Sequence, residues 1–390
     1  MTRRLKVLHV VHRLDYGGLQ RLVAGIVRRI DAERFESHVL SLGEFGRFAE
    51  GLEAVATLHR CQTVPHLSML WPGGLTRTIR AIAPHVLHTH DSVWYKASLA
   101  ARQAHVPRLV HTDHGRQHTG SWLVRLLDGL ASRRTDVVIA VSESLARRLA
   151  STVNSTRIRV VLNGVDTCGF RPRPASGAVR RELGLPAGAP VIGTIGRLDP
   201  IKGHDRMIQA FAQLRAAWPA DPAPMLVLIG DGPERARLAD LIDRLGLRES
   251  TRLVGWRRDV EDIYTVFDVF TLSSWSEGTS LGLLEAMSTG VCPVVTDVGG
   301  SPAVLGESLR HRLVRPGDPA ALADGWRDAL THPEQRAVDG VVARERVERV
   351  FSLDAMVRQY EQIYAGDEDS VGRVAARCAP LSAGVAAASR

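Results

Sequence analysis

Cysteine is scarce in this sequence. The chain of 390 residues contains four cysteines, which stand far apart and form no Cys-x-x-Cys pair: Cys61, Cys168, Cys292 and Cys378. Disulfide frameworks and structural zinc sites need clustered or regularly spaced cysteines. The sequence therefore predicts neither kind of site and favours a cytoplasmic protein.

Long apolar runs are also missing. No run approaches the ~18 residues that a membrane-spanning helix needs. The basic N-terminus is followed by an apolar stretch that ends at His12, which is too short for the core of a secretory signal. We therefore expect neither a membrane-spanning segment nor a signal peptide.

The composition is that of an ordinary globular protein, with 45% hydrophobic and 24% charged residues. The length of the chain indicates two domains. The net charge of +8 is unevenly distributed: residues 1–170 hold 23 Lys/Arg and 13 Asp/Glu, and the remainder hold 27 and 29. A basic first half favours anionic partners: acidic lipid headgroups, phosphorylated acceptors or nucleic acid. The alternative explanation is an arginine-rich composition on solvated helix faces.

Short apolar runs alternate with helical patterns throughout the first half. We expect strands at residues 6–11, 38–42, 86–89, 109–112 and 137–141, each followed by a helix. The alternation restarts after a proline-containing segment at 171–187, with strands at 191–195, 225–229, 251–254, 269–272 and 292–296. Such alternation indicates βαβ units and parallel sheets covered on both faces.

The domain boundaries follow from these patterns. We expect a first domain at residues 1–168, a second domain at 169–350, a final helix at 351–366 and a flexible tail at 367–390. The tail is assigned because its end is rich in Ala, Ser and Gly.

The most informative segment is residues 269–290, where a strand leads through a Ser/Gly-rich loop into a helix that starts near Ser280. Backbone N–H groups at Gly278, Thr279 and Ser280 would be unpaired there, which makes an anion site suited to a diphosphate. Glu277 precedes this helix and Glu285 lies within it, so both carboxylates could accept hydrogen bonds from hydroxyl groups. The alternative is that Glu285 is a helix-surface residue and that Glu277 is a partner of the helix dipole at its N-terminus.

Two further strand ends carry candidate residues. Arg197 and Lys202 flank a proline turn after the strand at 191–195, where they could neutralise a departing diphosphate. Otherwise each is an exposed salt-bridge partner. Gly17 and Gly18 form a turn at the corresponding edge of the first domain, where backbone can approach a ligand closely. The alternative is a plain turn between a strand and a helix.

Together these segments resemble the family 4 glycosyltransferases, retaining enzymes of the GT-B fold. The resemblance covers about residues 5–365. It is carried by GRLDPIKG (196–203), LVLIGDGPE (226–234), LVGWRRDV (253–260) and, above all, SEGTSLGLLEAMSTGVCPVV (276–295) followed by TDVGG. It implies an α/β protein with two Rossmann-like, doubly wound domains that face each other across a cleft.

The resemblance also implies that residues 1–168 form the acceptor-side domain, that residues 169–350 bind the nucleotide sugar, and that the helix at 351–366 crosses back to the first domain. It further assigns roles to individual residues. Glu277 would contact the donor sugar, and Glu285 would hold the ribose hydroxyls. Arg197 and Lys202 would hold the diphosphate, with Gly278, Thr279 and Ser280 beside it. Gly17 and Gly18 would line the cleft from the first domain, and His114 in LVHTDHG would lie beside the sugar.

These roles imply transfer of a sugar from a nucleotide-diphosphate sugar to a glycan or lipid-linked acceptor, in polysaccharide or glycoconjugate biosynthesis. Retention of configuration follows from the resemblance alone. The only Asp-x-Asp pattern, at Asp367 and Asp369, lies in the expected tail, so we expect metal-independent catalysis. No cofactor is expected, because the nucleotide sugar is a substrate, and nucleic acid is not an expected partner.

Other functions remain open. Gly278–Gly282 matches the G-x-S-x-G elbow of serine hydrolases, with Asp297 and His311 downstream in the right order. Gly230–Arg235 is a weak dinucleotide fingerprint that lacks its third glycine. A sugar-nucleotide 2-epimerase or a non-catalytic sugar-binding protein would share the fold.

The segment 122–134 combines an apolar face with arginines. It could rest on an anionic membrane surface, as in peripheral enzymes that act on lipid-linked acceptors. The alternative is an ordinary amphipathic helix of the domain.

Overall fold

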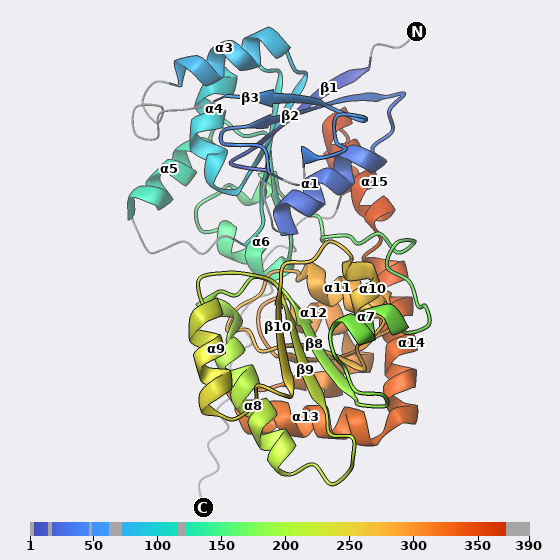
Figure 1. Cartoon of the computed structure of the whole chain (residues 1–390). Helices are drawn as coiled ribbons and strands as arrows, with labels where there is room; N and C mark the ends of the chain where they lie inside the picture. The colour runs from blue at the N-terminus through green and yellow to red at the C-terminus, as the bar shows by residue number, and fades with distance from the viewer. Residues whose placement is uncertain (1–3, 15–17, 47–48, 62–71, 116–121, 372–390) are drawn as a thin grey trace, which may run out of the picture.

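The structure, a computed structural model, describes residues 4–14, 18–46, 49–61, 72–115 and 122–371. Two lobes are stacked along the long axis of the molecule, the first blue to green and the second green to orange (Figure 1). Each is built on a parallel sheet, so the expected pair of doubly wound domains is confirmed.

The first sheet has the strand order β3-β2-β1-β4-β5-β6-β7. Its strands are β1 (Leu5–Val11), β2 (Phe35–Ser41), β3 (Thr57–Arg60), β4 (Val86–His90), β5 (Arg108–Asp113), β6 (Val137–Ala140) and β7 (Ile158–Val160). The helices of this domain are α1 (Gly18–Arg29), α3 (Gly73–Ile82), α4 (Trp94–Gln103), α5 (Trp122–Ser132) and α6 (Glu143–Leu149). Buried side chains of α1 cover one face of the sheet, and those of α3 and α4 cover the other.

The second sheet has the order β10-β9-β8-β11-β12-β13. Its strands are β8 (Val191–Ile195), β9 (Met225–Ile229), β10 (Thr251–Gly255), β11 (Val269–Leu272), β12 (Cys292–Thr296) and β13 (Leu313–Val314). All five residues of β9, MLVLI, are buried, because helices cover both faces of a parallel sheet.

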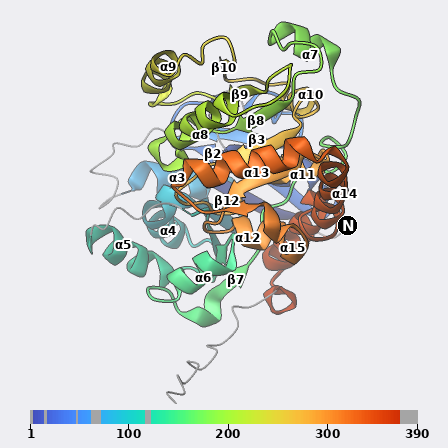
Figure 2. The ribbon, with the colours of Figure 1, turned by 90° about the horizontal axis from the view of Figure 1, so that it is seen from below.

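Helices of the second domain lie in two layers. The first layer is α8 (His204–Ala216), α9 (Arg235–Arg244) and α13 (Pro319–Thr331), and α8 and α13 lie side by side in the view from below (Figure 2). The opposite face is covered by α10 (Val260–Tyr264), α11 (Leu281–Ser288) and α14 (Pro333–Val350). Two further short helices are α7 (Gly177–Glu182) and α12 (Ser301–Leu305).

The chain returns to the first domain at its end. Val165 forms an isolated parallel bridge with Ser352, and α15 (Leu353–Ala365) then packs Met356 and Tyr360 into the core of the first sheet. Figure 1 shows α15 beside α1. The C-terminal helix therefore joins the two domains physically.

The expected flexible tail does not begin at residue 367. Glu368–Ser370 form a 3-10 turn, in which Glu368 pairs with Arg108 and Asp369 pairs with Arg159 at 3.1 Å. Val371 is buried in the first core. Arg108 of β5 and Arg159 of β7 thus face the acidic residues of this segment, and these contacts hold it on the first domain. Residues 372–390 lie outside the described part of the chain.

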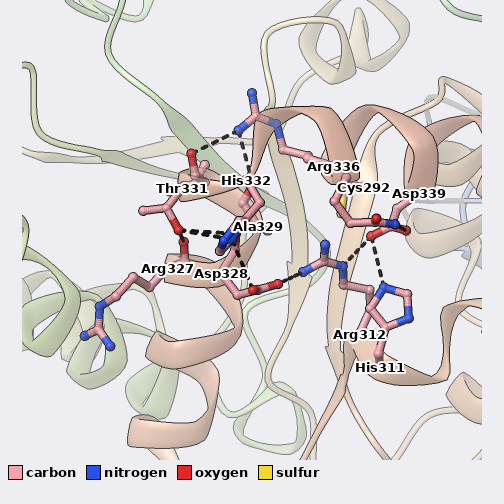
Figure 3. Close-up of polar contacts among 12 residues, drawn as sticks. Cys292, His311, Arg312, Arg327, Asp328, Ala329, Thr331, His332, Arg336 and Asp339 are labelled. Carbon is pink, nitrogen blue, oxygen red and sulfur yellow. Dashed lines mark hydrogen bonds and ion pairs between the residues drawn. The ribbon is translucent and has the colours of Figure 1, made fainter.

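A buried ion-pair network ties α13 and α14 to the segment before β13. Arg312 donates to Asp339 of α14 and Asp328 of α13, each at 2.6 Å, and its side chain is 1% exposed (Figure 3). Burial acts to raise the pKa of Asp339, but hydrogen bonds from Gln335, Arg312 and His311 outweigh it and the net shift is downward. The network lies outside the strand ends that carry the candidate site residues.

Candidate active site

Lys202 and Glu277 meet at the carboxyl edge of the second sheet. Each follows one of two hydrogen-bonded neighbours, β8 and β11, at the point where the strand order reverses. Ligands bind at such points in open α/β sheets. The Lys202 ammonium donates to both carboxylate oxygens of Glu277, at 2.7 and 2.9 Å, and the Ser274 hydroxyl donates to one of them at 2.5 Å. The Glu277 side chain is only 5% exposed, so these donors hold its carboxylate in one orientation.

Two glycines after β12 support the loop that carries Glu277. Gly299 has φ +54°, and a Cβ there would lie 1.9 Å from the carbonyl oxygen of Glu277. A Cβ on Gly300 would lie 2.3 Å from the carbonyl oxygen of Gly278. Only glycine lets the two backbones approach this closely. The TDVGG motif therefore holds the Glu277–Gly278 backbone in place.

Helix α11 begins immediately after this loop. The Ser280 side chain caps it by accepting from the backbone N–H of Leu283 at 3.4 Å. Within the described residues, the backbone N–H groups of Gly278, Thr279 and Ser280 donate to no protein acceptor. Free N–H groups at a helix start, with its dipole, form a binding site for an anion.

Glu285 lies one turn into α11 and points at the domain interface. Its carboxylate is 4% exposed and accepts from the Tyr264 hydroxyl at 2.8 Å and from the Arg21 guanidinium of α1. Burial and the Glu285 carboxylate raise the pKa of Tyr264 well above its ordinary value, so the hydroxyl remains a donor. Arg21 and Glu285 line a cavity of about 360 Å³ between the domains, together with Trp256, Glu261 and Leu281.

His114 stands across the interface from the Glu277 loop. It follows β5 of the first domain, and a Cβ built on Gly278 would lie 3.4 Å from its carbonyl oxygen. Two hydrogen bonds fix this approach: Thr279 donates from its hydroxyl to the Val141 carbonyl at 2.7 Å, and the Asn163 amide donates to the Thr279 carbonyl at 3.0 Å. The two strand-end sites therefore face one another.

Models of known protein families match both domains. A family model described as Glycosyltransferase Family 4 matches residues 16–168, and one described as Glycosyl transferases group 1 matches residues 176–345. The chain belongs to the family 4 glycosyltransferases. The expected family is thereby confirmed on both sides of the cleft.

Curated relatives of this glycosyltransferase include D-inositol 3-phosphate glycosyltransferase of Corynebacterium urealyticum, 33% identical over 54% of this chain and 51% of the relative. The match thus spans about half the length of that relative. A GDP-mannose-dependent alpha-(1-6)-phosphatidylinositol monomannoside mannosyltransferase of Mycobacterium tuberculosis is 25% identical over 90% of this chain and 95% of its own.

Solved structures share the fold. The crystal structure of Anabaena HepE in complex with UDP-glucose superimposes with a TM-score of 0.81, at 22% identity, over 93% of this chain and all of that one. Sucrose-phosphate synthase of Thermosynechococcus elongatus gives a TM-score of 0.77 at 20% identity, over 94% of this chain and all of its own. The GT-B architecture of this glycosyltransferase is therefore confirmed.

The site residues expected from the sequence are not all brought together. Lys202, Glu277 and the start of α11 adjoin one another, and Glu285 faces the interdomain cavity. Arg197 is 68% exposed and forms its described ion pair with Asp199, at 2.7 Å, rather than with Glu277. The exposed position after β8 leaves the long side chain free to reach the nearer aspartate.

The glycine turn of the first domain is partly described. Gly17 lies outside the described residues. Gly18 begins α1, and a Cβ on it would lie 3.3 Å from the Leu281 side chain at the start of α11. Gly18 therefore stands against the helix that carries Glu285.

The hydrolase alternative lacks a general base at Ser280. Its hydroxyl caps α11, and His311 Nε2 instead donates to the Asp339 carboxylate of the buried network, at 3.1 Å. A serine nucleophile needs a histidine within hydrogen-bond reach. No described contact joins Ser280 to any histidine.

Sequence reasoning missed Arg21 and Asn163, which reach the site from the first domain. It also assigned no role to the other histidines of that domain. His9, His88 and His90 place one ring nitrogen each within 4.8 Å of one another at the edge where β1 and β4 end. A signal was available, because the alternation of a strand puts His88 and His90 on one face.

Proposed function

We propose that this protein transfers a sugar from a nucleotide-diphosphate sugar to a glycan or lipid-linked acceptor, with retention of configuration and without a metal ion, in polysaccharide or glycoconjugate biosynthesis. The observation that carries the proposal is the position of the Lys202–Glu277 pair. It adjoins the free N–H groups that start α11, and the next residue along, Gly278, approaches the backbone carbonyl of His114 in the other domain.

The donor is proposed to lie along α11. Its diphosphate rests on the N–H groups of Gly278, Thr279 and Ser280, beside the Lys202 ammonium. Arg197 exchanges Asp199 for a phosphate oxygen, which its exposure permits. Lys202 and the helix start thereby meet the negative charge that develops on the departing diphosphate.

The two glutamates bind hydroxyl groups. A carboxylate oxygen accepts about two hydrogen bonds, and Arg21 and Tyr264 each take one on Glu285. The ribose hydroxyls take the remaining acceptor sites, from the 360 Å³ cavity. Glu277 accepts from the sugar hydroxyls in the same way, and His114 contacts the sugar from the first domain.

The identity of the donor is best found by screening. The relative from Mycobacterium tuberculosis is described as GDP-mannose-dependent, whereas the Anabaena structure contains UDP-glucose. Thermal unfolding is therefore measured with UDP-, GDP- and ADP-sugars, because a ligand that binds only the folded state raises the melting temperature. We expect one class to raise it, and Glu285→Ala and Lys202→Ala each to abolish the shift. If both variants keep the shift, the site is misplaced.

Catalysis is tested with the donor that the screen identifies. Nucleotide release should accelerate when a glycan or lipid-linked acceptor is added, and should persist in excess EDTA. NMR spectroscopy of the product should show the anomeric configuration of the donor. An inverted product, an epimerised sugar nucleotide, or loss of activity in EDTA would contradict the corresponding part of the proposal.

Contact with an anionic membrane is proposed for helix α5. No helix of the described residues is long and apolar enough to cross a bilayer. On α5, however, Trp122 is 74% exposed, Leu123 and Leu126 are also exposed, and Arg125 lies between them. An apolar face with adjacent arginines is typical of a helix that lies on an anionic surface.

The membrane proposal is tested with liposomes. The protein should sediment with phosphatidylglycerol vesicles at low salt and be released at high salt, and it should not bind phosphatidylcholine vesicles. Trp122→Ser/Leu126→Ser should abolish binding. Val338→Ser/Val341→Ser, which removes two exposed valines from α14, is the matched control. Equal binding by the two variants would exclude α5 as the contact.

A further inference from the structure

Three histidines of the first domain form a continuous hydrogen-bonded chain. His114 Nε2 lies 3.1 Å from His90 Nδ1, and His90 Nε2 lies 3.2 Å from His9 Nδ1. The rings are stacked, with centroids 5.4 and 5.5 Å apart. The chain therefore runs from the core, at the ends of β1 and β4, to the residue that faces Gly278.

Burial keeps this chain uncharged. His9 and His90 are at most 1% exposed. Burial lowers the pKa of His9 to about 4 and that of His90 well below its ordinary value, and neighbouring histidines lower the pKa of His90 further. Burial also lowers the pKa of His114, although Asp91 and Asp113 oppose the change. A neutral imidazole has one donor and one acceptor nitrogen, so the chain has a single direction.

The inner end of the chain sets that direction. His9 Nε2 is buried and has no hydrogen-bond partner among the described residues. An orphaned buried N–H is rarer in proteins than an orphaned acceptor. His9 therefore carries its proton on Nδ1 and donates to His90, and His90 donates from Nδ1 to His114 Nε2.

We propose that His9 and His90 are positioning residues that hold His114 as the Nδ1–H tautomer, so that it offers a hydrogen-bond donor to the donor sugar. In a neutral imidazole, the hydrogen bond made by one ring nitrogen decides whether the other nitrogen carries the proton. His114 Nε2 is occupied by His90, and Nδ1 has no partner among the described residues. The sugar contact rests on the proposed function, but the tautomer does not.

The neighbouring His88 gives no reason to interpret the cluster as a metal site instead. Its two ring nitrogens are occupied by the Tyr364 and Thr112 hydroxyls, both at 2.7 Å. Its closeness to His9 follows from the strand register, which pairs the two residues directly. The hydrogen bonds and the strand register therefore account for the close packing of these imidazole rings.

The tautomer is tested on the full-length protein, without any donor, by two-bond ¹H–¹⁵N NMR correlation of labelled histidines. The wild type should show a protonated Nδ1 and an unprotonated Nε2 on His114, and His90→Ala should change this pattern. His59→Ala is the matched control, because His38 and His59 form a similar stacked pair at 2.9 Å between β2 and β3. A protonated His114 Nε2 in the wild type, or an unchanged pattern in His90→Ala, would overturn the proposal.

Kinetics test the consequence for transfer. At metal sites, loss of the hydrogen-bond partner that orients a histidine lowers activity about tenfold or more. By analogy, His90→Ala should lower kcat about tenfold with little change in KM. His90→Asn, which keeps a donor near Nδ1, should recover part of the loss, and His59→Ala should match the wild type. A change confined to KM, or none in His90→Ala, would contradict positioning. Absence of transfer by the wild type would instead contradict the proposed function and leave the NMR result standing.

A titration with Zn²⁺ separates the two interpretations of the cluster. We expect no stoichiometric binding to the purified protein by calorimetry. One equivalent of Zn²⁺ bound by the wild type and lost in His88→Ala would overturn the proposal in favour of a metal site.

Discussion

Arg21 and Glu285 form an ion pair across the domain interface. They stand 264 residues apart, one on α1 and the other on α11, and the glutamate is almost fully buried. The pair leaves half of the acceptor capacity of the carboxylate unoccupied, since Tyr264 takes the only other described hydrogen bond to it. The first domain therefore orients a carboxylate that belongs to the second.

Removal of this arginine should weaken donor binding. In Arg21→Ala the buried Glu285 carboxylate loses its charged partner, and a hydrogen bond to a charged group is worth about 1.5–3 kcal/mol. We expect the Kd for the nucleotide, measured by calorimetry, to rise about tenfold or more. Arg21→Lys should show a smaller rise, and Arg80→Ala, an exposed position on α3, none. Tighter binding by Arg21→Ala would instead show that the ion pair competes with the ligand.

Lys202 and Glu277 should behave as a coupled pair. Lys202→Met leaves a buried carboxylate without its cation, which should lower the melting temperature. Adding Glu277→Gln removes the unpaired charge, so the double variant should regain stability without regaining donor binding. Lys6→Met, in β1, is the control for loss of a lysine. Recovery of donor binding in the double variant would mean that neither side chain contacts the donor.

Much of the second domain and part of its site were predictable from the sequence. Strands such as β9 and β11 are short apolar runs bounded by turns, which is the local signal of a buried parallel strand. Lys202 and Glu277 each follow such a strand, and parallel strands end at one edge of a sheet. To predict that the two side chains meet, it was therefore enough to know that these two strands are neighbours in the sheet.

The remaining features depend on information that is not local. β7 has three residues and β13 has two, too few for an alternation to be recognised. Arg21 meets Glu285 only because of the way the two domains pack, and nothing around either residue encodes that packing. The chain from His9 to His114 likewise depends on the registers of three neighbouring strands.

The Arg312 network should stabilise the second domain without affecting the site. Breaking a buried ion pair costs about 3–5 kcal/mol because it leaves an uncompensated charge. Asp339→Ala should therefore lower the urea midpoint strongly and leave the nucleotide Kd of the folded protein unchanged. Glu307→Ala, which removes an exposed pair with Arg310, should cost less than about 1 kcal/mol. Equal midpoints for the two variants would show that burial of Arg312 has no energetic consequence.

Acid should destabilise the protein through its buried histidines. Burial, aided by the charge of Lys202, lowers the pKa of His204 to about 4, whereas in the unfolded chain it is about 6.5. The unfolded state therefore binds more protons below pH 6.5, and the free energy of unfolding falls as the pH falls. From the two pKa values, His204 alone should remove roughly 2 kcal/mol by pH 5.

Melting temperatures measured between pH 7 and pH 5 test this contribution. His204→Leu replaces the imidazole with an uncharged side chain of similar bulk, so its melting temperature should fall less steeply with decreasing pH than that of the wild type. His332→Leu, at an exposed histidine of the same domain, should keep the steeper dependence of the wild type. Identical pH dependence in the wild type and His204→Leu would mean that the burial of His204 does not oppose its protonation.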